Sequence, residues 1–302
     1  MSDPIETASN TAAPATPAFG ERLASTMDKY GHLCVGIDPH TYLLERWGLP
    51  VSAVGAHEFG LRIIEKLAGR VGIVKPQVAF YERFGANGYR VLEDVFTAAR
   101  DAGLLVIADV KRGDVGSTLE AYSEAWLTPG MPLEADAMTI NPYQGFDTFK
   151  KPLEMTEQYG KGLFALAATS NPESASVQTA RRVRGTQEGR TVAGGIAARA
   201  ALWNREHAEG RTKGSVGVVI GATVDLERLD IDVDDLATEP DTPILAPGFG
   251  HQGADVADVR RIFGASAPNV IVNSSRGLLQ HGLEGLDAAI DEQLAVLERA
   301  FA

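Results

Sequence analysis

The chain has 302 residues, is 44% hydrophobic and 23% charged, and carries a formal net charge of −12. That length and composition suit one large α/β domain or two small ones, and no apolar run is long enough to span a membrane. The negative charge argues against nucleic-acid binding, which needs a basic face, and any anionic substrate must be captured by a local cluster of Lys and Arg.

The first twenty residues, Met1 to Gly20, are rich in Ala, Thr, Pro and Ser and contain acids but no Lys or Arg. They lack both the basic start and the apolar core of a signal peptide. We therefore expect a disordered tail over 1–20, followed by a single catalytic domain over 21–302.

Short apolar runs recur along the chain and are typical of β-strands covered on both faces. They are Leu33–Ile37, Gly72–Lys75, Leu104–Ala108, Ala137–Ile140, Leu163–Ala168, Val216–Gly221, Pro243–Ala246 and Val270–Asn273. Helical patterns lie between or after them, at His57–Ala68, Ala86–Ala102, Leu119–Trp126, Val192–His207, Val256–Phe263 and Leu283–Phe301. This alternation predicts a (β/α)₈ TIM barrel. A doubly wound open sheet stays an alternative, because periodicity does not show closure.

One connection is longer than a crossover requires, namely the segment from about 171 to 213. It contains the basic, glycine-containing stretch Arg181–Gly185. Since no internal repeat or compositional break marks a second domain, we interpret the segment as an elaborated loop of the same barrel.

The numbers and positions of cysteines and histidines limit which disulfides and metal sites the chain can form. Cys34 is the only cysteine, which excludes an intrachain disulfide or a cysteine-based zinc site and favours a reducing cytoplasm. Its position inside the apolar run Leu33–Ile37 predicts a buried structural thiol. The six histidines include no H-x-x-x-H pair, so we predict no metal site.

Three charges cluster after the third predicted strand, in the stretch Asp109-Val110-Lys111-Arg112-Gly113-Asp114. Side chains alternate along a strand, so Asp109 and Lys111 should point the same way, with Asp114 in the turn beyond. Burying a lone charge is costly, and these three must therefore neutralise each other or face a ligand. The alternative interpretation is an ordinary exposed salt bridge at a strand end.

Other strand ends also carry polar residues, as expected where loops after the strands build an active site. They are Asp38-Pro39-His40, Lys75-Pro76-Gln77, Asn141-Pro142-Tyr143, Thr169-Ser170-Asn171, Pro247–Gly253 and Ser274-Ser275-Arg276-Gly277. Gly248-x-Gly250-x-x-Gly253 matches the dinucleotide fingerprint, which belongs instead in an early βαβ unit. We interpret it as a phosphate cradle of backbone N–H groups, with Arg276 as a bidentate partner.

Taken together, these strand ends resemble the orotidine 5′-phosphate decarboxylase family, and most closely its bacterial branch with Lys-Arg-Gly-Asp and Thr-Ser-Asn motifs. The likeness runs from about Leu33 to Gly277 and rests on Asp38, Lys75, Asp109-x-Lys111-x-x-Asp114-Val115-Gly116-Ser117-Thr118, Pro247-Gly248, Gln252 and Arg276. The resemblance implies decarboxylation of orotidine 5′-phosphate to UMP and CO₂ in pyrimidine synthesis, without a cofactor. It also implies a homodimer with shared active sites.

The resemblance assigns roles to the charged residues. Lys111 is similar to the proton donor to C6 of the pyrimidine, and Asp109 to the carboxylate beside the departing substrate carboxylate. Lys75 would pair with Asp109 and touch the ribose. The chemistry itself needs a fixed ammonium, because loss of CO₂ leaves a carbanion at C6 with no adjacent π-system. Asp109 and Asp114 would keep Lys111 charged.

Further residues match the family's substrate contacts. Asp38 resembles the ligand of the ribose hydroxyls, and Ser170 the serine that contacts the base. Asp114 and Thr118 are similar to residues that a partner subunit donates. Gln252 and Arg276 match the phosphate ligands, and the substrate-binding set is completed by Pro247, Gly248 and Ser275.

Three rival functions remain open at this point. A magnesium-dependent sugar-phosphate decarboxylase of the 3-keto-L-gulonate 6-phosphate type shares D-x-K-x-x-D, but Lys75 puts a cation where its metal needs a carboxylate. A class I aldolase needs a lysine of depressed pKa, whereas Lys111 sits between two acids. A non-catalytic barrel that binds a phosphorylated metabolite would leave the alternating charges without a purpose.

Overall fold

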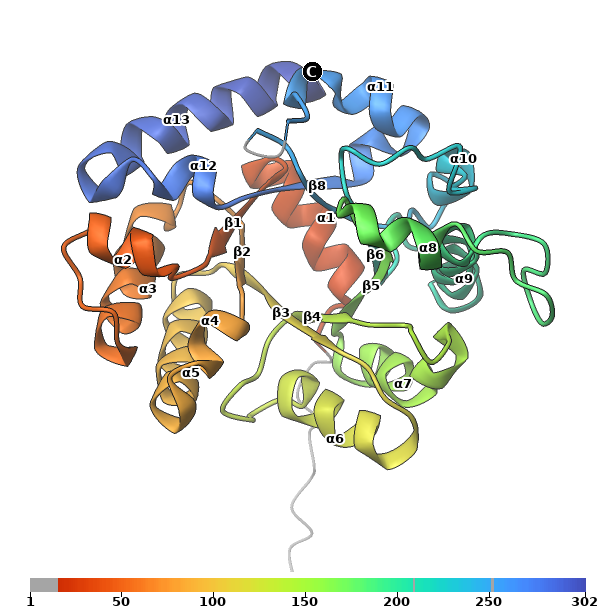
Figure 1. Cartoon of the computed structure of the whole chain (residues 1–302), viewed down its shortest axis with the longest axis horizontal. Coiled ribbons are helices and arrows are strands. Elements are labelled where there is room, and N and C mark those ends of the chain that lie inside the picture. The colour runs from red at the N-terminus through yellow and green to blue at the C-terminus, as the bar shows by residue number, and fades with distance from the viewer. Residues whose placement is uncertain (1–15, 209, 251–252) are drawn as a thin grey trace, which may run out of the picture.

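The structure is a computed structural model that describes residues 16–208, 210–250 and 253–302. Parallel strands form a closed barrel at its centre, paired in chain order with β8 returning to β1 (Figure 1). The strands are β1 (Leu33–Ile37), β2 (Ile73–Pro76), β3 (Leu105–Arg112), β4 (Ala137–Ile140), β5 (Gly162–Ala168), β6 (Val216–Ile220), β7 (Ile244–Pro247) and β8 (Val270–Ser274). The predicted TIM barrel is confirmed, and the doubly wound open sheet is wrong.

Helices surround the barrel (Figure 1). The longer ones are α3 (Ala53–Leu67), α5 (Gly85–Asp101), α6 (Gly116–Leu127), α7 (Lys150–Tyr159), α9 (Val192–His207) and α13 (Gly282–Phe301). Short ones are α2 (Thr41–Arg46), α4 (Ala79–Glu82), α8 (Ala175–Gln178), α10 (Val233–Leu236), α11 (Val259–Phe263) and α12 (Arg276–Leu279). No helix in the described ranges has the length and apolar character needed to cross a membrane.

Short 3₁₀ turns complete the secondary structure, at η1 (Phe146–Phe149), η2 (Pro172–Ser174), η3 (Val256–Asp258) and η4 (Gly264–Asn269). The single helix predicted over Val256–Phe263 is therefore divided between η3 and α11. In the long segment after β5, η2 and α8 are followed by an antiparallel bridge between Arg181 and Thr191, and α9 comes next.

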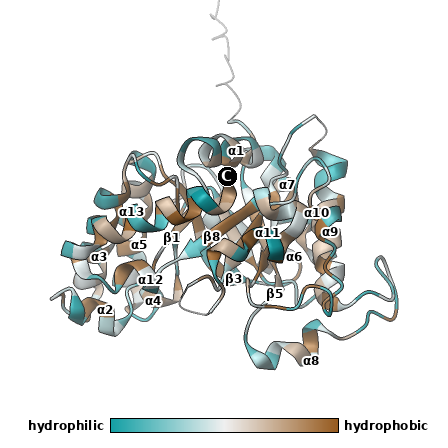
Figure 2. Ribbon diagram, turned by 90° about the horizontal axis from the view of Figure 1, so that it is seen from above, coloured by the Kyte–Doolittle hydropathy of each residue, from teal (hydrophilic) through white to brown (hydrophobic). Residues whose placement is uncertain are grey.

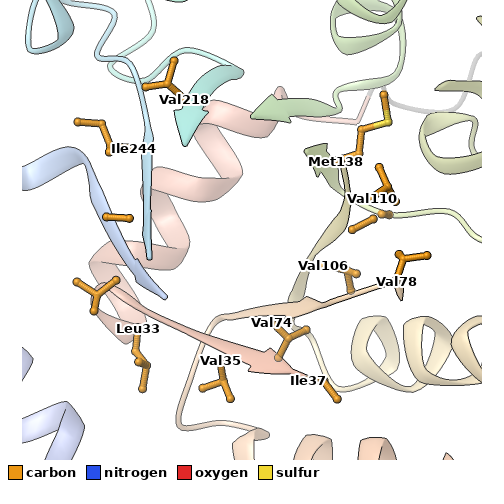
Figure 3. Packing of buried hydrophobic residues seen from close by; sticks show 14 of the residues in the cluster. Leu33, Val35, Ile37, Val74, Val78, Val106, Val110, Met138, Val218 and Ile244 are labelled. Atoms are coloured by element: carbon orange, nitrogen blue, oxygen red, sulfur yellow. The ribbon is translucent and has the colours of Figure 1, made fainter. Parts of the chain in front are cut away.

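Alternation along the strands divides the core into two layers. Leu33, Val35 and Ile37 of β1 belong to the layer between strands and helices, and Figure 3 shows Val35 and Ile37 near Val74 of β2. Cys34 belongs to the layer inside the barrel. It is fully buried, and burial raises the pKa of its thiol to about 12, which agrees with the predicted structural role.

Helix α1 (Phe19–Tyr30) closes the end of the barrel where the strands begin, opposite α8 (Figure 2). Its Phe19, Leu23 and Met27 recur every fourth residue and enter the inner layer. The Phe19 ring meets that of Phe164 edge to face, with centroids 6.0 Å apart. The opposite end of the barrel, where the strands finish, is left for the loops.

The predicted boundary of the tail is wrong at two residues. Phe19 and Gly20 were assigned to the tail, yet they begin α1 and are buried. A Cβ at Gly20 would lie 2.2 Å from the Lys213 carbonyl oxygen, so the helix approaches the barrel closely there. The Ala-, Thr- and Pro-rich composition before Phe19 concealed this start. The part of the predicted tail over 1–15 lies outside the described residues.

Candidate active site

Strand β3 extends beyond its predicted end, so that Asp109 and Lys111 lie within it. Its pairing with β4 shifts between Ala108–Met138 and Arg112–Ile140, which leaves three β3 residues opposite Thr139 alone. Lys111 has a left-handed backbone, with φ 47°. Such bulges re-aim side chains and recur beside active sites. Here the bulge directs the charged residues to the end of the barrel where the strands finish.

Asp109 lies between two ammonium groups. Its Oδ2 is 2.7 Å from Lys75 Nζ, and its Oδ1 is 2.5 Å from Lys111 Nζ. Lys75 and Asp109 are each 5% exposed, whereas the Lys111 side chain is 45% exposed. The prediction that Asp109 and Lys111 point the same way is confirmed. Of the two ammonium groups beside Asp109, that of Lys111 is therefore the one that a ligand in the site can reach.

Mutual attraction keeps the buried pair charged. Burial alone would raise the pKa of Asp109, but the charges of Lys75 and Lys111 outweigh it, and that pKa lies well below its ordinary value. Burial alone would lower the pKa of Lys75, but Asp109 and Asp38 outweigh it and raise that pKa above its usual range. Both groups are therefore ionised throughout the neutral pH range.

Two uncharged residues to which the sequence assigned no role hold this array in place. Thr139 Oγ1 donates a 2.9 Å hydrogen bond to Asp109 Oδ1 and accepts one from the Lys111 N–H at 2.9 Å. Gln77 donates to the Asp109 carbonyl and accepts from Lys111 Nζ, both at 3.2 Å. Their sequence signals were a hydroxyl inside an apolar strand and a polar residue two positions after Lys75.

A cavity of about 280 Å³ opens over this array. It is lined by the predicted residues Asp38, Lys75, Asp109, Lys111, Ser170 and Pro247. Its remaining lining is Gln77, Thr139, Leu166, Thr169, Asn171, Val219, Leu245 and Asn273. All eight strands, or the loops that directly follow them, contribute to this lining, which is the arrangement expected at the active end of a TIM barrel. The cavity combines an apolar wall with convergent polar groups, as ligand sites do.

A smaller cavity of about 100 Å³ adjoins it and shares Asp38, Pro247 and Asn273. The predicted Gly248, Ser275 and Arg276 line it, with Phe249, Ser274 and Gly277. Within the described ranges, Asp38 Oδ1, Asn273 Oδ1 and Ser275 Oγ are buried without a hydrogen-bond partner. Buried polar atoms are normally bonded, so these three favour a polar ligand across both cavities.

Two predicted residues are not brought into this site by the chain's own fold. Asp114 and Thr118 line neither cavity, and Thr118 is exposed near the start of α6. The Asp114 carboxylate accepts a 2.8 Å hydrogen bond from the Val115 N–H. Gln252 lies outside the described residues.

Over the described ranges, no group of three or more His, Cys, Asp or Glu side chains could hold a metal ion. At the end of β2 stands a lysine and not a carboxylate. Lys75 Nζ lies against Asp109 and occupies the position beside the one buried carboxylate of the array.

Comparison with known proteins identifies the family. The model of the orotidine 5′-phosphate decarboxylase / HUMPS family matches residues 31–289, most of the chain. The chain belongs to this family. Family membership confirms the resemblance carried by the strand ends.

Individual members of the family match over nearly their whole lengths. An orotidine 5′-phosphate decarboxylase from Streptomyces coelicolor is 46% identical over 265 residues, covering 87% of this chain and 90% of that protein. One from a Nocardioides species is 47% identical over 262 residues, covering 87% and 92%. The crystal structure of a Streptomyces avermitilis protein, described as a candidate orotidine 5′-phosphate decarboxylase, matches with a TM-score of 0.86 and 44% identity, covering 95% and 96% of the two chains.

Proposed function

We propose that this protein decarboxylates orotidine 5′-phosphate to UMP and CO₂ in pyrimidine biosynthesis, with Lys111 as the proton donor. One observation carries the assignment of roles, namely the Lys75–Asp109–Lys111 array at the floor of the larger cavity. The reaction itself is that of the named relatives, which are 46% and 47% identical to this chain. It makes the protein a carboxy-lyase.

Lys111 would act on the carbon that loses CO₂. The bond from C6 to the substrate carboxylate breaks, and its electron pair stays on C6. The ammonium of Lys111 stabilises that charge and then transfers a proton to C6, which yields UMP, and water restores the lysine. Its 45% exposed side chain can reach a ligand, whereas the buried Lys75 is held on Asp109. Asp109 would lie beside the departing carboxylate.

The two cavities suit the two ends of the nucleotide. The larger one would hold the base against Ser170 and the apolar wall, with the ribose on Asp38 and Lys75. The smaller one would hold the phosphate on Arg276 and the backbone N–H groups around Gly248 and Ser275, and we assign Gln252 to the same group. Binding energy from the remote phosphate can then support the chemistry at C6.

We also propose that no metal ion or other cofactor takes part. The rival metal-dependent sugar-phosphate decarboxylase needs a carboxylate at the end of the second strand. Lys75 stands there instead, 5% exposed and ion-paired, and the positive charge of its ammonium would repel a divalent cation.

We also propose a cytoplasmic location, as expected from the single cysteine.

A homodimer with shared active sites is the last part of the proposal. Asp114 and Thr118 line neither cavity of their own chain, although Asp114 comes only three residues after Lys111. Val115 and Tyr143 are 52% and 81% exposed. These features support a second copy of the chain seated on this side, to which Asp114 and Thr118 would be donated.

One assay tests the assignment. Protein treated with EDTA is mixed with orotidine 5′-phosphate, and ultraviolet absorbance and CO₂ release are followed with and without added Mg²⁺. We expect equal turnover in both conditions. Activity that needs Mg²⁺ would contradict the cofactor-free proposal and favour the sugar-phosphate rival, and no turnover in either condition would reject the decarboxylase assignment.

A further inference from the structure

A side-chain network outside both cavities joins the end of β3 to the helices that follow β2. Arg112 forms an ion pair with Glu82, the last residue of α4. Tyr89 of α5 donates a 2.6 Å hydrogen bond to the same Glu82 oxygen, and its hydroxyl lies 3.4 Å from the Arg112 guanidinium. Arg112 also donates to the Val110 carbonyl at 3.2 Å. The arginine therefore ties the bulged part of β3 to its neighbours.

The backbone of Lys111 makes such a connection necessary. Its φ of 47° is uncommon for a residue with a side chain, and it persists only where the surroundings determine it. On the β4 side, the Lys111 N–H donates to Thr139 Oγ1 at 2.9 Å, and the Asn141 N–H donates to the Arg112 carbonyl at 2.7 Å. On the β2 side, the Arg112 side chain provides the connection. Arg112, the residue after Lys111, is thus held through its backbone on the β4 side and through its side chain on the β2 side.

We propose that Arg112, Glu82 and Tyr89 form a positioning clamp that keeps Lys111 in its left-handed conformation, with its ammonium directed at the reacting carbon. This inference rests on the proposed decarboxylase function. None of the three residues lines either cavity. The clamp therefore acts through Lys111 and has no contact with the substrate.

The charges within the clamp persist at neutral pH. Burial alone would raise the pKa of Glu82, but hydrogen bonds from Tyr89 and Arg112 outweigh it and lower that pKa below its usual value. Burial alone would lower the pKa of Arg112, and Glu82 raises it overall. An ionised Glu82 can then accept from both partners at once, as the strong charge-assisted kind of hydrogen bond requires.

Arg112→Met tests the clamp, because it removes the guanidinium and keeps an apolar side chain. We expect kcat on orotidine 5′-phosphate to fall about 10²-fold, since misplacing a catalytic group by about 1 Å has an effect of that size. The Kd for UMP, measured by calorimetry, should stay unchanged. Arg112→Lys should recover part of kcat through its remaining charge. The matched control Arg62→Met breaks the Arg62–Glu58 pair on α3 and should leave kcat unchanged.

A double variant separates positioning from a general structural effect. Added to Lys111→Ala, Arg112→Met should cause no further loss of the residual activity, because the clamp acts only through Lys111. Light scattering checks the oligomeric state, since Arg112 also lies 5.8 Å from the Tyr122 ring on α6. If Arg112→Met does not fold, Tyr89→Phe, which removes one hydroxyl, should lower kcat at unchanged UMP affinity.

Several results would overturn the clamp: unchanged kcat in Arg112→Met, equal losses of kcat and UMP affinity, or a further loss in the double variant. These results count against the clamp only if the wild-type protein turns over orotidine 5′-phosphate. A wild type without turnover rejects the proposed function and the clamp with it. If the wild type turns over the substrate and Arg112→Met has the same kcat, the clamp alone is rejected.

Discussion

Lys75 lies 2.7 Å from Asp109, and both side chains are buried, so neither charge is satisfied by bulk water. Breaking one half of such a pair leaves an uncompensated buried charge. Removing either partner should therefore destabilise the barrel, and both residues also line the larger cavity.

The pKa of Asp109 is lowered in the folded state, so its contribution to stability is present above the unfolded pKa of about 3.9 and is lost as pH falls through the folded value. The pKa of Lys75 is raised, so its contribution is present below the unfolded pKa of about 10.4 and is lost as pH rises through the folded value. The pair thus contributes constantly between about pH 5 and pH 9.

We predict that Lys75→Met lowers the free energy of unfolding by about 3 kcal/mol at pH 7, near the lower end for a broken buried pair because Lys111 still faces Asp109. The loss should shrink as pH falls, because Asp109 without Lys75 takes up a proton more readily. Urea unfolding at pH 7 and pH 4 measures this. Lys66→Met, which breaks the half-exposed Lys66–Asp287 pair, serves as the control and should cost less than about 1 kcal/mol. A pH-independent loss in Lys75→Met would argue against a charge effect.

Lys111→Ala should lower kcat by about 10²–10⁴-fold or more, because the other ammonium of the cavity, that of Lys75, is buried and held on Asp109. The melting temperature and the Kd for UMP should stay close to those of the wild type. Lys151→Ala removes a half-exposed lysine that lines neither cavity and should leave kcat unchanged. Substantial turnover by Lys111→Ala would mean that another group protonates C6.

Arg276→Ala should chiefly raise the KM for orotidine 5′-phosphate, because Arg276 lines the smaller cavity. Losing a charge-assisted bidentate contact reduces transition-state binding of the phosphorylated substrate. The nucleoside orotidine, which lacks the phosphate, should be affected much less in the same assay. Arg261→Ala, at an exposed arginine paired with Asp258, is the comparison variant. Similar losses with both substrates would remove Arg276 from the phosphate site.

Mixed dimers test the proposal that Asp114 completes the partner's site. Lys111→Ala and Asp114→Asn homodimers should both be severely impaired. In the heterodimer, one site has Lys111 and Asp114 intact and the other carries both lesions. Random pairing makes half of the dimers mixed, with one intact site of two, so about a quarter of wild-type activity should return. No recovery after subunit exchange, with heterodimers verified by native mass spectrometry, would put Asp114 in the site of its own chain.

Several parts of the site follow from local sequence alone. The apolar runs predicted every strand to within a few residues, because a parallel strand covered on both faces must be apolar along its length. The charges after such runs then had to meet at one end of the barrel, where all parallel strands finish. Lys75, Asp109 and Lys111 could be selected for this reason, and so could Asp38 and Arg276.

Long-range packing decided the rest. Closure of the sheet, the bulge opposite Thr139 and the left-handed Lys111 depend on strand pairing between residues far apart in the chain. Gln77 and Thr139 became part of the site because that pairing brings them against Asp109. The burial of Phe19 depends on its contact with Phe164, which is distant in the sequence. Local sequence thus determined which residues are strands and which carry charge, and the tertiary structure determined which of them touch, because contact depends on the closure of the whole barrel.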